Sequence, residues 1–237
     1  MDAQAEKQHL LDQIEEYADP EYAQVISRTI PSKLEVYGLR VFDLRQIVRA
    51  WRRTHKDVVA EDLLALAEAL WDGQSREERM LALELLRHYP QYIPGLAWSS
   101  FERCRRDLDN WELTDVLGVG VVGPWVLDDV DARAQHLRDL IADEDVWSRR
   151  LGLVGAIGLN RARKDARFPK PTFALMDQVK EERHPMITKA VSWMLRDLSK
   201  KHPDRVAAYL EVNRDVLAAH IVREVDNKLK TGLKSGK

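Results

Sequence analysis

The sequence has one cysteine, Cys104, and no long apolar run. A single cysteine excludes an internal disulfide framework and any metal site built from several cysteines, and it is compatible with a reducing compartment. No apolar stretch approaches the roughly 20 residues that a helix needs to span a bilayer. The first residues are acidic and polar, without the basic and then apolar segments of a secretory signal. We therefore expect a cytoplasmic protein that makes no contact with a membrane.

Two further patterns are scarce. Strict alternation of apolar and polar residues, the mark of a half-buried strand, is nearly absent. The best strand candidate, residues 116–127, contains glycines and a proline that fit a connection between helices better than a strand interior.

The seven histidines are scattered without the spacing of metal ligands. We therefore expect no metal and no other cofactor.

Helical periodicity dominates what is present. Residues 61–71, 76–88 and 186–201 carry apolar side chains at helical spacing, and the third segment is the most strongly patterned. The prolines fall between such segments, where proline can begin a helix but rarely lies inside one. The pattern predicts an all-α protein of about a dozen helices, paired antiparallel and joined by short loops.

The length of 237 residues leaves room for one solenoid or two small domains. Because no helix carries enough apolar surface to stand alone, stacked pairs that share a continuous core are the simplest arrangement. We predict a single HEAT-like helical-repeat solenoid over residues 1–225, although no convincing self-match supports the repeat. Residues 226–237 are polar, basic and glycine-containing, and we expect them to form a frayed tail.

The formal net charge of −2 hides a strong asymmetry. Residues 1–90 contain 12 Lys and Arg against 17 Asp and Glu, whereas residues 147–201 contain 13 against 5. Such a local excess of cations favours a surface that faces a polyanion. The alternative is a solvated helical surface that happens to be basic.

The helix predicted over 186–201 has a second patterned face. Lys189, Trp193, Arg196 and Lys200 lie at i, i+4, i+7 and i+11, away from the apolar stripe. A tryptophan among cations suits a phosphate backbone together with an apolar sugar or base face. The alternative is that Trp193 packs beneath the next repeat and the cations are ordinary surface residues.

Two shorter clusters contain tryptophan near a charged residue. Trp111 and Asp115 are four residues apart, so on a helix they share a face. Trp147 and Arg150 are three apart, and the spacing of Trp147 to Val154 favours a core position for this tryptophan. Either cluster alone is more typical of a core aromatic beside a solvated charge than of a site.

Together these segments resemble the AlkD-type DNA alkylation repair proteins. The family's Trp-x-x-x-Asp element is matched by residues 111–115, and its Trp-x-x-Arg element by residues 147–150. Its Lys-Ala-x-x-Trp-x-Leu-Arg helix is matched by residues 189–196, and residues 37–51 are similar to an N-terminal segment. The order, the spacing and the chain length agree, so the resemblance covers nearly the whole chain.

The resemblance implies a HEAT-repeat DNA glycosylase with a concave basic DNA-binding face. Asp115 would be the catalytic carboxylate, Trp111 and Trp193 would flank the lesion nucleotide, and Arg150 would contact a phosphate. Further cations would extend the contact with the DNA backbone: Lys189, Arg196, Arg161, Arg163 and Lys164. The expected partner is double-stranded DNA with alkylated purines, bound by a monomer.

The chemistry implied is hydrolysis of an N-glycosidic bond. A purine alkylated at N3 or N7 is cationic and leaves as a neutral base, so a carboxylate that stabilises the oxocarbenium-like sugar and positions water is sufficient. No lysine need act as a Schiff-base nucleophile, so we expect a monofunctional enzyme. The alternatives are a non-catalytic DNA-binding module and, more distantly, a protein–protein scaffold.

Two positions depart from the family pattern. The tyrosine that the family commonly has in its second helix falls at Thr29, so this aromatic wall is either missing or supplied by Tyr22 or Tyr37. The acidic residue after the first tryptophan is Glu112 where the family often has Asp. The first change affects which lesions fit, whereas the second is mild.

Overall fold

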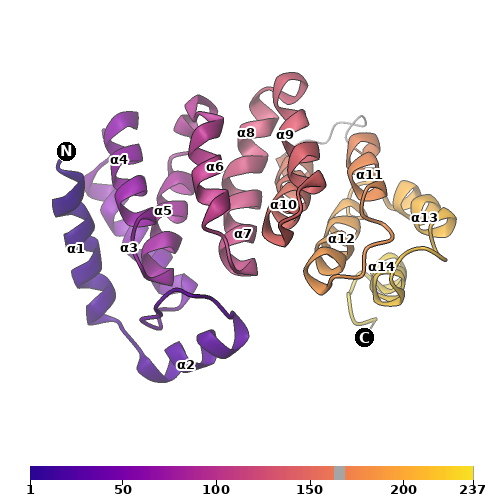
Figure 1. Cartoon of the computed structure of the whole chain (residues 1–237), viewed down its shortest axis with the longest axis horizontal. Coiled ribbons are helices and arrows are strands. Elements are labelled where there is room, and N and C mark those ends of the chain that lie inside the picture. The colour runs from indigo at the N-terminus through magenta and orange to yellow at the C-terminus, as the bar shows by residue number, and fades with distance from the viewer. Residues whose placement is uncertain (163–168, 237) are drawn as a thin grey trace. The chain divides into compact units, whose positions relative to one another are not determined.

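The computed structural model describes residues 1–162 and 169–236 (Figure 1). These residues form fourteen α-helices, one 3₁₀ helix and one π-helical turn, and their only β-type pairing is an isolated bridge between Glu35 and Ser75. The all-α prediction is confirmed. The chain divides into two compact units, Met1–Val116 and Leu117–Lys237. Among the helices of the described segments, none has both the length and the hydropathy needed to cross a membrane.

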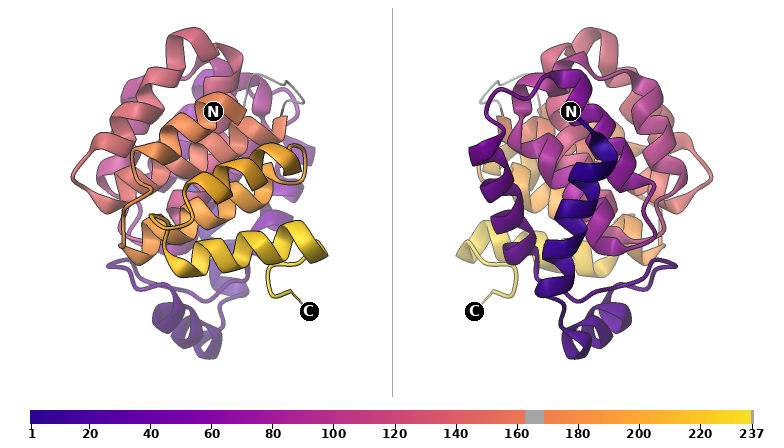
Figure 2. Two further views of the ribbon diagram at one scale, coloured as in Figure 1. Left: turned by 90° about the vertical axis from the view of Figure 1, so that its right-hand side faces the viewer. Right: turned by 90° about the vertical axis from the view of Figure 1, so that its left-hand side faces the viewer.

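Unit 1 is built around α5, which packs against α3 and α4, while α4 also packs against α1. Its helix α2 lies at one end, apart from the other helices of the unit (Figures 1 and 2). The elements in chain order are α1 (Ala3–Glu16), α2 (Pro20–Thr29), α3 (Val41–Thr54), α4 (Ala60–Trp71), α5 (Arg76–His88), the 3₁₀ helix η1 (Pro90–Gly95), α6 (Trp98–Arg106) and α7 (Trp111–Leu117), whose last residue begins unit 2.

Local sequence explains how α2 and α5 begin. The Asp19 side chain accepts hydrogen bonds from the backbone N–H groups of Glu21 and Tyr22, and Pro20 occupies the first turn. Ser75 and Glu78 form a reciprocal capping box at the start of α5. Each cap satisfies backbone donors that the first helical turn leaves without partners.

Unit 2 is built around α10, which packs against α8, α9 and α12, and α12 in turn packs against α14. The elements in chain order are the π-helical turn η2 (Gly118–Val122), α8 (Gly123–Asp128), α9 (Val130–Ala142), α10 (Val146–Ala162), α11 (Pro169–Asp177), α12 (Pro185–Leu198), α13 (Pro203–Val212) and α14 (Ala219–Thr231). Successive packing of α10, α12 and α14 is the arrangement expected of helical repeats.

The predicted apolar stripes face the interiors of the units. Most of their members are buried, namely Leu63, Leu66, Ala67, Leu70, Met80, Leu83, Ile187, Ala190, Val191, Met194, Leu195 and Leu198. Leu86 and Met186, at the margins of their stripes, are half-buried. Helical spacing therefore identified the buried faces of α4, α5 and α12.

Residues 116–127 are helical, so the prediction that they form a connection between helices is wrong. They form the end of α7, then η2 and most of α8. A Cβ atom on Gly123 would lie 2.7 Å from the Gly155 carbonyl oxygen and 2.8 Å from the Gly158 Cα, and one on Gly118 would lie 2.3 Å from a methyl carbon of Val154. The glycines thus permit close packing of η2 and α8 against α10. In the sequence alone, glycines that serve this purpose look the same as glycines that form a turn.

The chain end also differs from the prediction. Helix α14 continues to Thr231, so residues 226–231 are helical and not frayed. Gly232 ends the helix in the left-handed region at φ +76°, and its N–H donates to the Lys228 carbonyl at 3.0 Å. The Lys234 ammonium lies 3.2 Å from the Glu224 carboxylate, which ties the segment after the helix back to α14.

Candidate functional site

Trp111 and Asp115 lie one turn apart on α7, and both are half-buried. The helix begins after Asn110, whose side-chain oxygen accepts the Leu113 N–H at 3.1 Å. The Thr114 hydroxyl donates to the Asn110 carbonyl at 2.6 Å. Since α7 is helical over this stretch, the predicted common face for the tryptophan and the carboxylate is confirmed.

The segment after α2 holds the start of α7. The Asp109 carboxylate accepts hydrogen bonds from the Ser32 hydroxyl at 2.8 Å and the Lys33 N–H at 2.7 Å. Desolvation opposes ionisation of Asp109, but these hydrogen bonds prevail and lower its pKa. The Trp111 indole N–H donates to the Thr29 carbonyl at 3.4 Å. These three hydrogen bonds to the end of α2 and the segment after it therefore hold Trp111 and the residues before it in place.

A buried ion pair anchors α7 to α5. Arg76 is 4% exposed and donates to both oxygens of Glu112, at 2.6 Å from Nε and 2.7 Å from Nη2. Its Nη1 also donates to the Leu39 carbonyl and to Glu77, at 3.0 and 2.9 Å. Desolvation disfavours the charged guanidinium, yet hydrogen bonding to Glu112 raises the pKa of Arg76. Glu112 is thus a structural partner that fixes α7 next to Trp111.

Glu77 extends this network to the chain before α3. It is fully buried and accepts hydrogen bonds from the N–H groups of Tyr37, Gly38 and Leu39, at 3.1, 3.1 and 3.2 Å. Gly38 has φ +93°, and a Cβ there would lie 2.0 Å from the Asp19 carbonyl oxygen. We did not predict this network, and the only signal in the sequence is the run of charged residues that follows Ser75.

Thr29 contacts the indole of Trp111 through its backbone carbonyl. It is exposed, and its hydroxyl donates back to the Val25 carbonyl within α2 at 2.8 Å. Tyr22 lies two turns earlier on α2, with the Arg40 guanidinium 5.3 Å from its ring centre. Tyr37 lies beyond the helix, and burial raises the pKa of its phenol. At this edge Trp111 therefore meets the backbone of a threonine.

Arg150 belongs to unit 2 and is 5% exposed. Its Nη1 donates to the Met186 carbonyl in the first turn of α12, at 2.6 Å. Its neighbour Arg149 pairs with Glu182 at 2.7 Å. Hydrogen bonds from the backbone N–H groups of Arg183 and His184, together with the side chain of Arg149, lower the pKa of Glu182 to about 2. Arg150 therefore joins α10 to the first turn of α12, and Arg149 joins α10 to the segment that precedes α12. Trp147 is half-buried, so its predicted core position holds only in part.

Of the predicted row of cations around Trp193, Lys189 and Arg196 lie on α12, whereas Lys200 lies two residues beyond the end of the helix. Lys189 and Lys200 are exposed, whereas Trp193 itself is half-buried. The Arg161 guanidinium, from α10, lies 5.5 Å from the Trp193 ring centre and pairs with Asp197 at 3.1 Å. Lys200 reaches the same carboxylate at 2.8 Å. Trp193 therefore lies against a cation that a buried carboxylate holds in place.

The remaining predicted DNA contacts differ in their surroundings. Arg196 is half-buried, with its Nε 3.3 Å from the Ser192 hydroxyl and 3.7 Å from Glu224 on α14. Arg163 and Lys164 lie outside the described residues. Trp111 and Asp115 belong to unit 1, and the other described members of the predicted site belong to unit 2.

Neither a metal centre nor a cysteine nucleophile emerges from the described segments. No group of three or more His, Cys, Asp and Glu side chains in them could hold a metal ion. Burial raises the pKa of the Cys104 thiol to about 12, which keeps it protonated near neutral pH.

Comparison with known proteins identifies the family. The sequence profile of the DNA alkylation repair enzyme family matches residues 10–229. No curated protein matches the chain. A solved structure described as a predicted DNA alkylation repair enzyme from Enterococcus faecalis has 19% identity and a TM-score of 0.71, over 90% of this chain and 97% of that one.

The AlkD2 structure from Streptococcus mutans has 18% identity and a TM-score of 0.54, over 81% of this chain and 88% of that one. These likenesses show a common fold and confirm the predicted helical-repeat fold class. Since the profile spans nearly all of the sequence, the chain belongs to the DNA alkylation repair enzyme family.

Proposed function

We propose that this repair protein is a monofunctional DNA glycosylase for purines alkylated at N3 or N7 in double-stranded DNA. Membership in the family supports a role in repair of alkylated DNA. One observation carries the finer proposal: the half-buried carboxylate of Asp115 lies one turn from Trp111 on α7. Buried contacts hold the start of this helix in place.

In the proposed reaction the bond between C1′ and the purine nitrogen breaks, and the bonding electron pair leaves with the base. A cationic base becomes neutral on departure, so it needs no proton. Asp115 stabilises the positive charge that develops on the sugar and accepts a proton from the water whose oxygen bonds to C1′. Trp111 and Trp193 add cation–π stabilisation of roughly 0.5–2 kcal/mol each, depending on desolvation.

The cations of unit 2 supply the proposed contact with the DNA backbone. Exposed Lys189 and Arg161 bind phosphates directly, with Arg196, Arg163 and Lys164 extending the same contact. Arg150, which also donates to the Met186 carbonyl, is proposed to contact a phosphate at the same surface. The proposed enzyme is a cytoplasmic monomer without cofactor, associated with chromosomal DNA, in which residues 1–225 act as one HEAT-like domain.

The decisive experiment measures release of free base from duplex DNA that contains 7-methylguanine. We expect the wild-type protein to release 7-methylguanine but not uracil, and Asp115→Asn to slow release by about 10²–10⁴-fold while duplex binding persists. Asp131→Asn, which changes an exposed carboxylate on α9, is the matched control and should keep full activity. Undiminished release by Asp115→Asn would reject the assignment of the carboxylate.

A non-catalytic module that binds damaged or branched DNA is the second candidate. Thr29 favours it, because an exposed threonine rather than an aromatic side chain lies beside Trp111. The same assay separates the two candidates. Salt-dependent duplex binding without any base release by the wild-type protein would establish the module and reject the glycosylase.

A further inference from the structure

A buried serine on α12 connects Arg196 to α14. Ser192 is fully buried and lies one turn before Arg196 on the same helix. Its oxygen accepts a hydrogen bond from the Arg196 Nε at 3.3 Å, and its hydroxyl donates to the Glu224 carboxylate at 2.6 Å. Because the serine accepts from a cation and donates to an anion, each hydrogen bond strengthens the other. The three side chains therefore form one polarised chain between the two helices.

This chain engages only one edge of the Arg196 guanidinium. Its Nε meets Ser192 and lies 3.7 Å from Glu224, whereas Nη1 and Nη2 have no hydrogen-bond partner among the residues that the structure describes. The side chain is 20% exposed, so part of it still reaches solvent. The Nη1 and Nη2 groups can donate in parallel to two oxygens of one phosphate. A guanidinium that is held at Nε also loses less conformational entropy when it binds.

The segment after α14 offsets the charge of Glu224. The Lys234 ammonium lies 3.2 Å from Glu224 Oε1, while Ser192 and Arg196 approach Oε2. The carbonyl of Lys234 accepts a hydrogen bond from the Asn227 side chain at 3.1 Å, which keeps this lysine next to α14. Desolvation opposes ionisation of Glu224, but the Ser192 hydroxyl and the two cations prevail and lower its pKa. One carboxylate between two cations leaves a net charge of +1, so the cluster still attracts a phosphate.

The cluster lies beside a tryptophan of the proposed DNA contact. Trp193 precedes Arg196 by three residues on α12, so the two side chains are neighbours on the helix surface. Both are half-buried, as is Glu224. The alternative role of the chain is to join α12 to α14, which pack against each other. The two roles differ in their effect on DNA binding, because a carboxylate close to a polyanion ordinarily weakens the interaction.

We propose that Glu224 is a positioning residue, which through Ser192 holds Arg196 so that Nη1 and Nη2 bind a DNA phosphate next to Trp193. Lys234 balances the carboxylate and keeps the surface positive. This inference rests on the proposed contact between unit 2 and DNA, and it requires no base release. Its signature is the sign of one effect. Removal of the Glu224 carboxylate makes the protein more positive by one charge, yet it should weaken duplex binding.

Fluorescence anisotropy of the full chain with a labelled duplex tests this sign. We expect Glu224→Ala to weaken duplex affinity by at least about threefold. In an Arg196→Ala background the same change should not weaken affinity further, because the residue that Glu224 positions is absent. Glu224→Gln keeps an acceptor for the Ser192 hydroxyl, so it should recover part of the loss.

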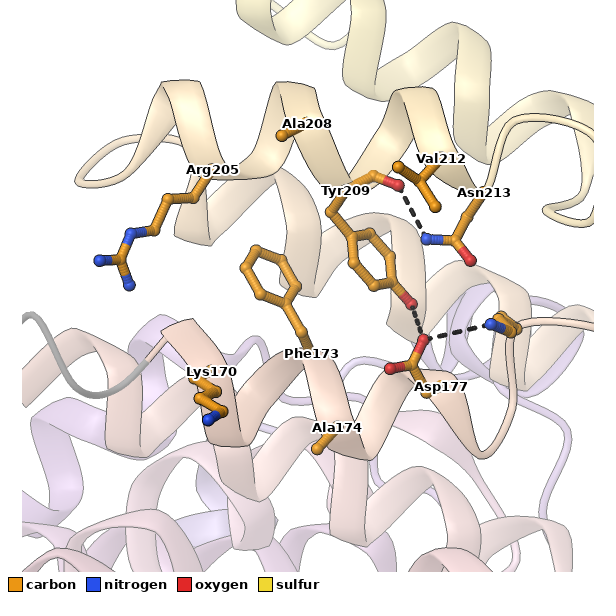
Figure 3. Close-up of a pocket in the computed structure, with 10 residues that line it drawn as sticks. Lys170, Phe173, Ala174, Asp177, Arg205, Ala208, Tyr209, Val212 and Asn213 are labelled. Carbon is orange, nitrogen blue, oxygen red and sulfur yellow. Dashed lines mark hydrogen bonds and ion pairs between the residues drawn. The ribbon is translucent and has the colours of Figure 1, made fainter.

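Asp177→Ala is the matched control in the same unit. The Asp177 carboxylate also accepts a hydroxyl hydrogen bond, from Tyr209 at 3.1 Å, and lies 3.4 Å from the Lys180 ammonium, in the groove between α11 and α13 (Figure 3). Since no residue of the proposed DNA contact takes part in this group, Asp177→Ala should leave duplex affinity unchanged or raise it slightly.

Duplex affinity of Glu224→Ala equal to or above that of the wild type would overturn the proposal. An equal loss in the Arg196→Ala background would also overturn it, because Glu224 would then act through the fold. If thermal unfolding shows that Glu224→Ala does not fold, Ser192→Ala breaks the same chain and gives the same comparison. Base release by the same proteins separates the two proposals. A wild type that binds duplex without releasing 7-methylguanine rejects the glycosylase alone, and release with unaltered affinity of Glu224→Ala rejects this inference alone.

Discussion

At the scale of single residues, the contacts that position the candidate catalytic face are mostly buried and charged. Trp111 and Asp115 are only half-buried, but Glu112, the residue that follows Trp111, is bound on both oxygens by Arg76. A bidentate ion pair fixes the relative orientation of the two side chains as well as the distance between them. The orientation of α7 therefore depends on a charge pair that itself lies away from solvent.

Breaking this pair from one side should be costly. We expect Arg76→Met to lower the free energy of unfolding by about 3–5 kcal/mol, because Glu112 would remain buried without its partner. The double variant with Glu112→Leu should recover part of that loss, since it removes the carboxylate of Glu112, while Glu77 keeps its three backbone N–H donors. Urea unfolding of both single variants and the double variant measures the coupling. Additive losses would show that the two side chains do not stabilise each other.

The residues of the candidate site are predictions that the sequence itself suggests, whereas the residues that hold them in place carry no such local signal. Trp193 stood out because its neighbours on the helix are cations, and helical spacing alone placed it there. Arg76 and Glu112 are 36 residues apart, and no local pattern marks a pair that only the fold brings together. Arg150 shows a further limit, since the sequence gives its charge but not its 5% exposure.

At the scale of helices, the spacing of apolar residues predicted the buried faces well, whereas amino-acid composition predicted the connections between helices poorly. The stripes of α4, α5 and α12 are buried as expected. Residues 116–127 misled us because glycine serves two purposes, turn formation and close helix packing, and the sequence does not distinguish them. The partner glycines on α10, Gly155 and Gly158, are the missing information.

Where η2 and α8 pack closely against α10, replacing glycine by alanine should lower stability despite the higher helix propensity of alanine. We expect Gly123→Ala to destabilise the protein by about 1–3 kcal/mol, although alanine is the better helix former, because its Cβ would press on the α10 backbone. Thermal unfolding measures the effect. Gly95→Ala is the matched control, since a Cβ there meets no atom within 4 Å, and it should be neutral or slightly stabilising. Equal effects of the two changes would contradict a packing role for Gly123.

At the scale of the whole molecule, the distribution of charge matters more than its sum. A net charge of −2 would suggest a poor partner for DNA, yet residues 147–201 carry a large excess of cations. Affinity for a polyanion depends on the cations at the contact and on the counterions that they release.

Salt dependence should reveal which cations touch DNA. We expect the logarithm of duplex affinity to fall linearly with the logarithm of salt concentration, by about 0.9 for each phosphate neutralised. Lys189→Ala should reduce the magnitude of the slope by about 1. Lys56→Ala removes an exposed charge from unit 1 and should leave the slope unchanged. Fluorescence anisotropy with a labelled duplex measures both. An unaltered slope for Lys189→Ala would remove this lysine from the contact.

The seam between η2, α8 and α10 also constrains how this sequence can evolve. A larger residue at Gly123 has no room until the opposing backbone at Gly155 and Gly158 withdraws, and one substitution cannot move both walls. Such positions change only in concert, while the outer faces of the same helices are free to drift. Relatives that diverge to the level of 19% identity should therefore retain small residues here long after their surfaces have become unrecognisable.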